Sequence, residues 1–126
     1  MSDDRPKFPR FPNSSWPMTH EEVMAIIVPE LTRRIVELVA PSRIILFGSA
    51  ARGQMGPDSD LDVLVVMPDG SDHKRTLDAL NYGVRIGFSK DLLVVTEGEL
   101  KEYGEDPWLI YRQALAEGKE LYRREE

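Results

Sequence analysis

The sequence contains no cysteine among its 126 residues, which excludes disulfide bonds and thiolate metal ligands. This absence fits the reducing cytoplasm, where we expect the protein to act. No apolar run approaches the roughly 18 residues that a membrane-spanning helix needs. The polar, proline-rich start also lacks the apolar core of a secretory signal. We therefore expect no membrane partner.

Basic residues are scarce relative to acidic ones. The chain has 16 lysines and arginines against 22 aspartates and glutamates, for a formal net charge of −6. Such a chain has little of the positive surface that supplies most non-specific affinity for nucleic acids, so no direct nucleic-acid partner is expected. A local mononucleotide site is compatible with this negative total. The length and an apolar content of 41% suit one compact domain.

We expect residues 1–18 to form an extended proline-rich arm and residues 19–126 to form the folded domain. The closely spaced prolines of this arm exclude a continuous helix. Phe8, Phe11 and Trp16 are unusual in a purely disordered tail. Two interpretations stay open: the arm folds partly over its own domain, or it docks on a partner.

Helix signals begin directly after the arm. Thr19 and Glu22 form a capping-box pair that predicts a helix start, Pro41 predicts its end, and Pro29 predicts a kink or break between them. Apolar residues at helical spacing predict the buried face of this helix, which comprises Val23, Ile26, Ile27, Leu31, Ile35 and Leu38.

Three short apolar runs, at residues 43–47, 61–66 and 91–95, predict β-strands. The middle run is apolar almost throughout, which indicates a strand covered on both faces. The expected helices are a short one over residues 48–53, one from Ser71 to about Arg85, one starting at the Thr96–Glu99 capping box, and one capped by Asp106 and ended by Gly118. This order predicts an α/β (α+β) domain with a small sheet.

The run GSAARGQMGPDSDLD, residues 48–62, carries the clearest functional pattern. Asp60 and Asp62 are two residues apart, so on a strand their carboxylates point to the same face. Two neighbouring carboxylates repel each other, and a divalent cation removes that repulsion. Paired carboxylate oxygens suit Mg²⁺, which usually keeps coordination sites for water and substrate phosphate.

The start of the same run favours phosphate binding. Gly48 allows a close backbone approach, and the Ser49 hydroxyl with nearby backbone amides at a short helix suits a phosphate group. Arg52 can reach a phosphate or fold back onto an acidic residue such as Asp58. Carboxylates for a metal beside a phosphate site indicate chemistry on a nucleoside triphosphate. The alternative is an ordinary turn followed by a solvated strand end.

This run resembles the nucleotidyltransferase motif of the DNA polymerase β-like superfamily, a Gly-Ser pair followed by ten residues and Asp-x-Asp. The longer pattern LFGSAARG…SDLDVLVV resembles the minimal nucleotidyltransferase (MNT) domains, which are the antitoxins of HEPN/MNT toxin–antitoxin pairs. The likeness extends from Glu21 to Tyr122 and implies a nucleotidyltransferase fold over residues 19–126, with a small mixed sheet flanked by helices. It also implies a third carboxylate, Asp91, and two Mg²⁺ ions. The alternative for Asp91 is an exposed ion pair with Lys90.

The resemblance implies transfer of AMP from ATP to a tyrosine hydroxyl of a partner HEPN toxin. About 30 residues follow the third strand, enough for two short helices, so we expect the acceptor to come from another protein. Two alternatives stay open: a catalytically inactive antitoxin that neutralises its toxin by binding, and a nucleotidyltransferase for a small molecule or RNA end that works with a separate chain. A homo- or hetero-oligomer is compatible with each. His20 and His73 lie outside the motif, and we expect both at solvated surface positions.

Overall fold

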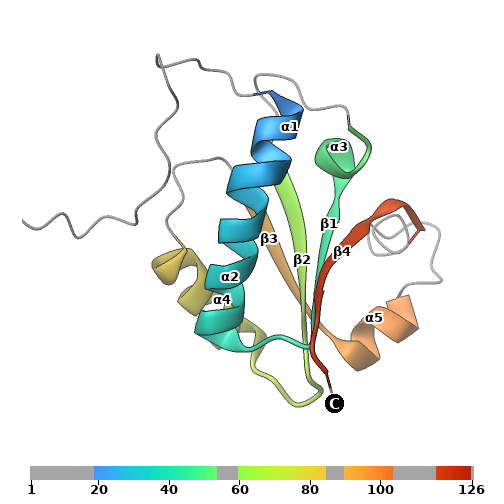
Figure 1. Cartoon of the computed structure of the whole chain (residues 1–126). Coiled ribbons are helices and arrows are strands. Elements are labelled where there is room, and N and C mark those ends of the chain that lie inside the picture. Colours follow the sequence, from blue (N-terminus) through green and yellow to red (C-terminus); the bar gives the residue numbers. More distant parts are fainter. Residues whose placement is uncertain (1–18, 54–59, 85–89, 104–115, 126) are drawn as a thin grey trace, which may run out of the picture.

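A computed structural model describes residues 19–53, 60–84, 90–103 and 116–125, and the expected arm over residues 1–18 lies outside this part (Figure 1). The described residues contain a four-stranded sheet in the order β3-β2-β1-β4. Its strands are β1 (Arg43–Phe47), β2 (Leu61–Met67), β3 (Lys90–Thr96) and β4 (Lys119–Arg123). β1 runs antiparallel to β2 and β4, whereas β2 and β3 are parallel. The prediction of a small mixed sheet is confirmed.

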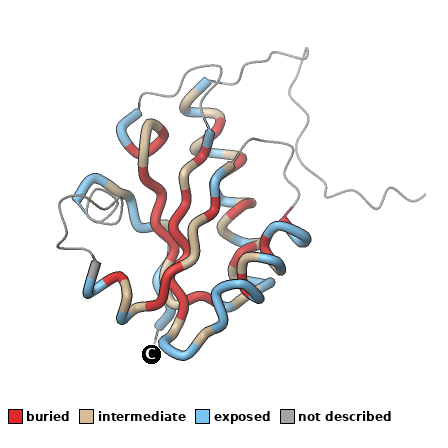
Figure 2. Tube along the Cα trace, turned by 180° about the vertical axis from the view of Figure 1, so that it is seen from behind, coloured by how far each residue is buried: buried red, intermediate tan, exposed pale blue. Residues whose placement is uncertain are grey.

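β2 lies inside the sheet and is buried on both faces, as its almost continuous apolar run predicted. Leu61, Val63 and Val65 belong to the core that faces the long helices, whereas Leu64 and Val66 belong to a smaller core on the opposite face. Figure 1 shows α2 (Val28–Val39) and α4 (His73–Gly83) on one side of the sheet and α5 (Glu97–Tyr103) on the other. β1 and β2 therefore form the buried centre of the sheet, whereas β3 is buried in part and the edge strand β4 is exposed or half-buried (Figure 2).

The first long helix has three parts: α1 (His20–Glu22), the π-helical segment η2 (Val23–Ile27) and α2. The Thr19–Glu22 capping box is present, with hydrogen bonds in both directions. Pro29 stands at the first turn of α2, where its missing N–H is tolerated. The expected irregularity at this proline thus takes the form of a preceding π-helical turn. None of the helices in the described ranges is long and apolar enough to cross a bilayer.

The predicted apolar stripe of this helix is the face that packs on the sheet, with one exception. Val23, Ile27, Leu31 and Ile35 are buried. Leu38 is 43% exposed and lies beside Gly83 at the end of α4. The helix ends two residues later at Ala40, which adopts the left-handed conformation.

The helix after β2 starts one residue later than predicted. Asp72 is the N-cap of α4 and accepts a hydrogen bond from Arg75 N. The predicted cap, Ser71, instead donates its hydroxyl hydrogen bond to the Pro68 carbonyl. A carboxylate is an equally good cap, so local preference alone did not separate the two residues.

The C-terminal part corrects a second prediction. A strand, β4, pairs antiparallel with β1 at the edge of the sheet, where only helices were expected after β3. The α5 helix does start at the predicted capping box, because Thr96 N and the Glu99 carboxylate are hydrogen-bonded. The helix expected after Asp106 lies outside the described residues, apart from a helical end at Ala116–Glu117 before Gly118.

Candidate active site

The parallel pairing of β2 and β3 brings two predicted site residues together. Asp62 and Asp91 are register partners across this pair, where neighbouring strands lie about 4.8 Å apart. Asp60 lies directly before β2, and its charge acts on the Asp62 carboxyl. The register of β2 and β3 places Asp62 and Asp91 on one face of the sheet, at the end where both strands begin.

Electrostatics links these carboxylates. Burial raises the pKa of the Asp62 carboxyl above its ordinary value, and the charges of Asp91 and then Asp60 raise it further. The positive charge of Arg52 lowers the pKa of Asp62. Asp60 and Asp91 are exposed, whereas Asp62 is half-buried. The protein therefore holds like charges close together at this end of the sheet.

The donor chemistry of these residues fits a hard divalent cation, because three carboxylates supply oxygen ligands and excess negative charge. In the described ranges, however, no three His, Cys, Asp or Glu side chains are gathered as a metal centre. The fit therefore rests on the shared face and on the raised pKa of Asp62.

Gly48 begins the four-residue helix α3 (Gly48–Ala51), directly after β1. Its φ of +74° lies in the left-handed region that disfavours other residues. A β-carbon at this position would lie 2.3 Å from Asp62 Oδ2. We expected the glycine to leave room for phosphate, and the structure adds a second reason, which is room for the Asp62 carboxylate.

The remaining phosphate-site candidates lie on or beside α3. Ser49 is partly exposed within the helix, which is held on the sheet by the buried Ala50 and Ala51. Arg52 is the C-cap of α3, and its Nη1 lies 3.5 Å from Oε2 of Glu117, just before β4. Asp58, the acidic partner we had considered for Arg52, lies outside the described residues. Sequence reasoning did not single out Glu117, because a contact 65 positions away along the chain leaves no local pattern.

The expectation of a solvated surface position holds for His73 but not for His20. His73 contacts the Glu99 carboxylate while remaining largely exposed. His20 is partly buried, and its Nδ1 is buried without a hydrogen-bond partner in the described part of the chain.

Two aspartates at α4 have structural roles. Asp72 caps the helix, and Asp78 forms an ion pair with Lys74 at 2.8 Å.

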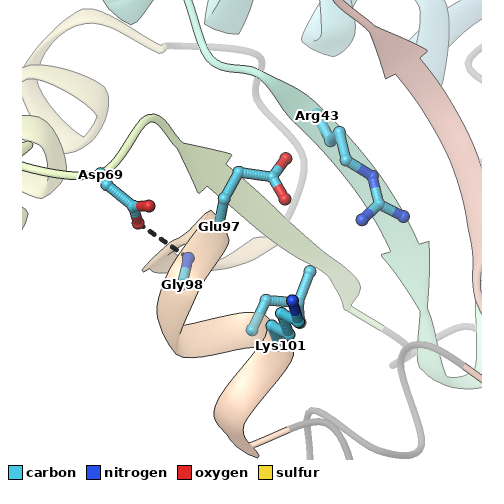
Figure 3. Close-up of a pocket in the computed structure, with 6 residues that line it drawn as sticks. Arg43, Asp69, Glu97, Gly98 and Lys101 are labelled. Atoms are coloured by element: carbon cyan, nitrogen blue, oxygen red, sulfur yellow. Dashed lines mark hydrogen bonds between the residues drawn. The ribbon is translucent and has the colours of Figure 1, made fainter.

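Two pockets of the described residues lie at the opposite end of the sheet, where β1 begins. One has a volume of about 410 Å³ and is lined by Arg43, Asp69, Glu97, Gly98, Leu100 and Lys101. Figure 3 shows the mixed charges that line it and the hydrogen bond between Asp69 and Gly98. β2 and β3 run from Asp62 and Asp91 toward this end, so these pockets are separate from the carboxylates. The candidate site is therefore identified by the chemistry of its side chains and not by a pocket.

Comparison with known proteins identifies the family. A model of the nucleotidyltransferase domain family matches residues 28–122, a range that includes all six predicted site residues. The chain belongs to the nucleotidyltransferase family. It is therefore a nucleotidyltransferase enzyme, as the motif over residues 48–62 indicated.

One relative in this family is a Methanocaldococcus jannaschii protein provisionally named protein adenylyltransferase MJ0604. The identity is 36% over 83 residues, which covers 64% of this chain and 77% of the relative.

Solved structures agree on the fold of this nucleotidyltransferase. A provisionally named nucleotidyltransferase from Sulfolobus solfataricus superposes with a TM-score of 0.59 at 23% identity, covering 89% of this chain and 96% of the other. A provisionally named minimal nucleotidyltransferase gives 0.52 at 26% identity, covering 83% and 98%. A toxin–antitoxin structure with AMP-PNP gives 0.51 at 21% identity, covering 76% and 73%.

Proposed function

We propose that this nucleotidyltransferase is a Mg²⁺-dependent protein adenylyltransferase that transfers AMP from ATP to a hydroxyl of a partner toxin and thereby acts as an antitoxin. The observation that carries the proposal is the pairing of Asp62 with Asp91 beside Gly48. The adenylyltransferase name of the 36%-identical relative supports the reaction. ATP as substrate and the absence of cysteine both favour a cytoplasmic location.

In this proposal Asp60, Asp62 and Asp91 hold two Mg²⁺ ions. Bound there, the ions would neutralise charge on the phosphates during an in-line displacement. Asp91 lies on the outer strand β3, so it is the carboxylate that would meet an incoming acceptor and help to ready its hydroxyl. The repulsion that raises the pKa of Asp62 favours cation binding, because a cation relieves it.

Gly48, Ser49 and Arg52 would hold the phosphates of ATP. Gly48 places the start of α3 against Asp62, so a phosphate at this helix lies next to the carboxylates. The new bond joins the acceptor oxygen to the α-phosphorus, and the bond to the departing pyrophosphate breaks. The protein contributes position and charge, which are the main contributions in phosphoryl transfer.

The acceptor in this proposal is a tyrosine hydroxyl of a HEPN-domain toxin. The resemblance of residues 46–66 to MNT antitoxins supports this partner. The fold shared with a protein solved in a toxin–antitoxin complex with AMP-PNP agrees with it. In the described ranges the sheet and its helices form one small domain, with no separate unit beside Asp91 to hold an acceptor.

The test is transfer of label from α-³²P-ATP with Mg²⁺, with and without the candidate HEPN-domain toxin. The proposal expects a labelled toxin band, released pyrophosphate and loss of toxin activity. A toxin that is silenced by complex formation without label would replace the enzyme with a binding antitoxin. Label on an RNA end or small molecule, with none on protein, would favour a different acceptor class.

A further inference from the structure

Arg52 lies between two acidic groups that come from different strands. β1, which leads into α3, is flanked by β2 on one side and β4 on the other. Phe47 pairs with Asp62 across the first interface, and Leu46 pairs with Lys119 across the second. The chain just before Lys119 therefore passes beside α3, and this places Glu117 across from the carboxylate end of β2.

The contacts of Arg52 follow this arrangement. Its guanidinium lies 3.5 Å from the Glu117 carboxylate, and its charge also acts on Asp62. The two side chains of the ion pair are 38% and 48% exposed, so water reaches both. An ion pair this exposed contributes little to stability, which leaves its position beside the site as the feature to explain.

We propose that Glu117 is an intramolecular counter-ion that occupies Arg52 in the empty site and releases it to the triphosphate of the incoming nucleotide. The inference rests on the proposed function, since it takes the phosphates of ATP as the competing ligand. Glu117 is a positioning residue in this scheme, because it acts on the nucleotide through Arg52.

The chemistry of the pair suits an exchange of this kind. A guanidinium binds phosphate with two parallel hydrogen bonds, whereas the exposed carboxylate of Glu117, 3.5 Å from Arg52 Nη1, is a weak competitor. Release is inexpensive because the freed Glu117 carboxylate remains hydrated. Before nucleotide binds, the pair keeps the guanidinium beside the carboxylates of β2, where the phosphates are to lie.

The experiment measures Mg-ATP affinity by calorimetry for the parent, Glu117→Gln, Arg52→Gln and the double variant. Removing the competing charge should tighten Mg-ATP binding on the order of two- to fivefold, the range that an exposed ion pair allows. In the Arg52→Gln background the same change should have no effect. The gain should also shrink as salt increases, because both charges are exposed.

Glu37→Gln is the matched control. Glu37 pairs with Arg33 at 2.8 Å, both side chains are more than half exposed, and the pair lies on α2 away from α3. This variant removes the same charge from a similar ion pair, so it should leave Mg-ATP affinity unchanged.

The outcomes separate the two proposals. If the parent does not bind Mg-ATP, the proposed function is wrong, and the role of Glu117 is wrong with it. If the parent binds and Glu117→Gln binds equally or more weakly, only the counter-ion role is wrong, and a weaker affinity would make Glu117 a support for Arg52. Equal tightening with and without Arg52 would indicate general repulsion instead of competition.

Discussion

The acidic residues at the two ends of the sheet have opposite electrostatic surroundings. Where β1 begins, Asp69 accepts a hydrogen bond from Gly98 N, and Glu120 is bound by Arg123 and Arg43. The hydrogen bond from Arg123 lowers the pKa of Glu120. Where β1 ends, burial and the charges of Asp91 and Asp60 raise the pKa of Asp62. Acidic residues stabilise the fold at one end and oppose it at the other.

This difference is the pattern expected of the proposed site at the carboxylate end. A fold gains nothing from like charges held together on adjacent strands. Their presence at the end that also carries Gly48 is the arrangement expected where a ligand completes the charge balance. The two described pockets lie at the opposite end of the sheet, where the charges are already balanced.

The largest expected effect is on catalysis at the carboxylate end. Asp91→Asn should lower the rate of toxin labelling by about 10²–10⁴ while leaving ATP binding largely intact, because electrostatic and acid–base contributions are of that size. Labelling rates with α-³²P-ATP would measure this. Asp69→Asn removes a carboxylate at the opposite end and should label at the parental rate. An Asp91→Asn protein with parental labelling would remove Asp91 from the site.

The next effect is on ligand-linked stability. Mg-ATP at about 100 times its dissociation constant should stabilise the parent by about 2.7 kcal/mol through binding linkage. The double variant Asp60→Asn/Asp62→Asn should remain folded and lose this increase in melting temperature. Thermal unfolding with and without Mg-ATP measures both. A double variant that responds like the parent would contradict the metal assignment.

A pair of glycines compares strain at the site with strain in an ordinary turn. Gly70 has φ +90° with open space around it, so Gly70→Ala should cost about 1 kcal/mol from its backbone conformation alone. Gly48→Ala adds a clash with Asp62 and should cost about 2–4 kcal/mol, together with nucleotide affinity. Urea unfolding and calorimetry measure the two effects. Equal losses of unfolding free energy in the two variants would mean that the Asp62 side chain moves away from the new β-carbon without cost.

The smallest effect is the opposite pH dependence of the two ends. The pKa of Asp62 is raised on folding, so its contribution to stability falls as pH rises through the folded pKa. The pKa of Glu120 is lowered, so its stabilisation is present above the unfolded pKa and is lost as pH falls through the folded one. At pH 7, Asp62→Asn should raise the melting temperature of the nucleotide-free protein by about 1–3 °C, and Glu120→Gln should lower it by a similar amount. Changes of the same sign in the two melting temperatures would contradict the proposed difference between the two ends of the sheet.

Much of the fold followed from local pattern. The strands β1, β2 and β3, the capping boxes at Thr19 and Thr96 and the short helix at Gly48 lie where the sequence predicted them. Each rests on a short-range rule, such as apolar runs, cap residues or glycine. The misplaced cap of α4 is a small error of the same kind, since two adjacent residues were both suitable.

β4 and Glu117 were missed for a different reason. Residues 119–123, KELYR, have two adjacent apolar residues among charges, so no alternation predicts a strand. The strand exists because β1 offers an unpaired edge. Leu38 had the right spacing for burial, but it lies beside the last residue of α4 and remains 43% exposed.

The sequence by itself determined the chemistry of the proposed site: a glycine–serine turn and two aspartates two residues apart at the start of a strand. These are properties of neighbouring residues and need no knowledge of the fold. Only the tertiary structure decided which residues meet them, by aligning Asp91 with Asp62, placing the Asp62 carboxylate against Gly48 and bringing Glu117 to Arg52. Strand order and register set these contacts, because pairing joins residues that are distant along the chain, and no local rule specifies the partner.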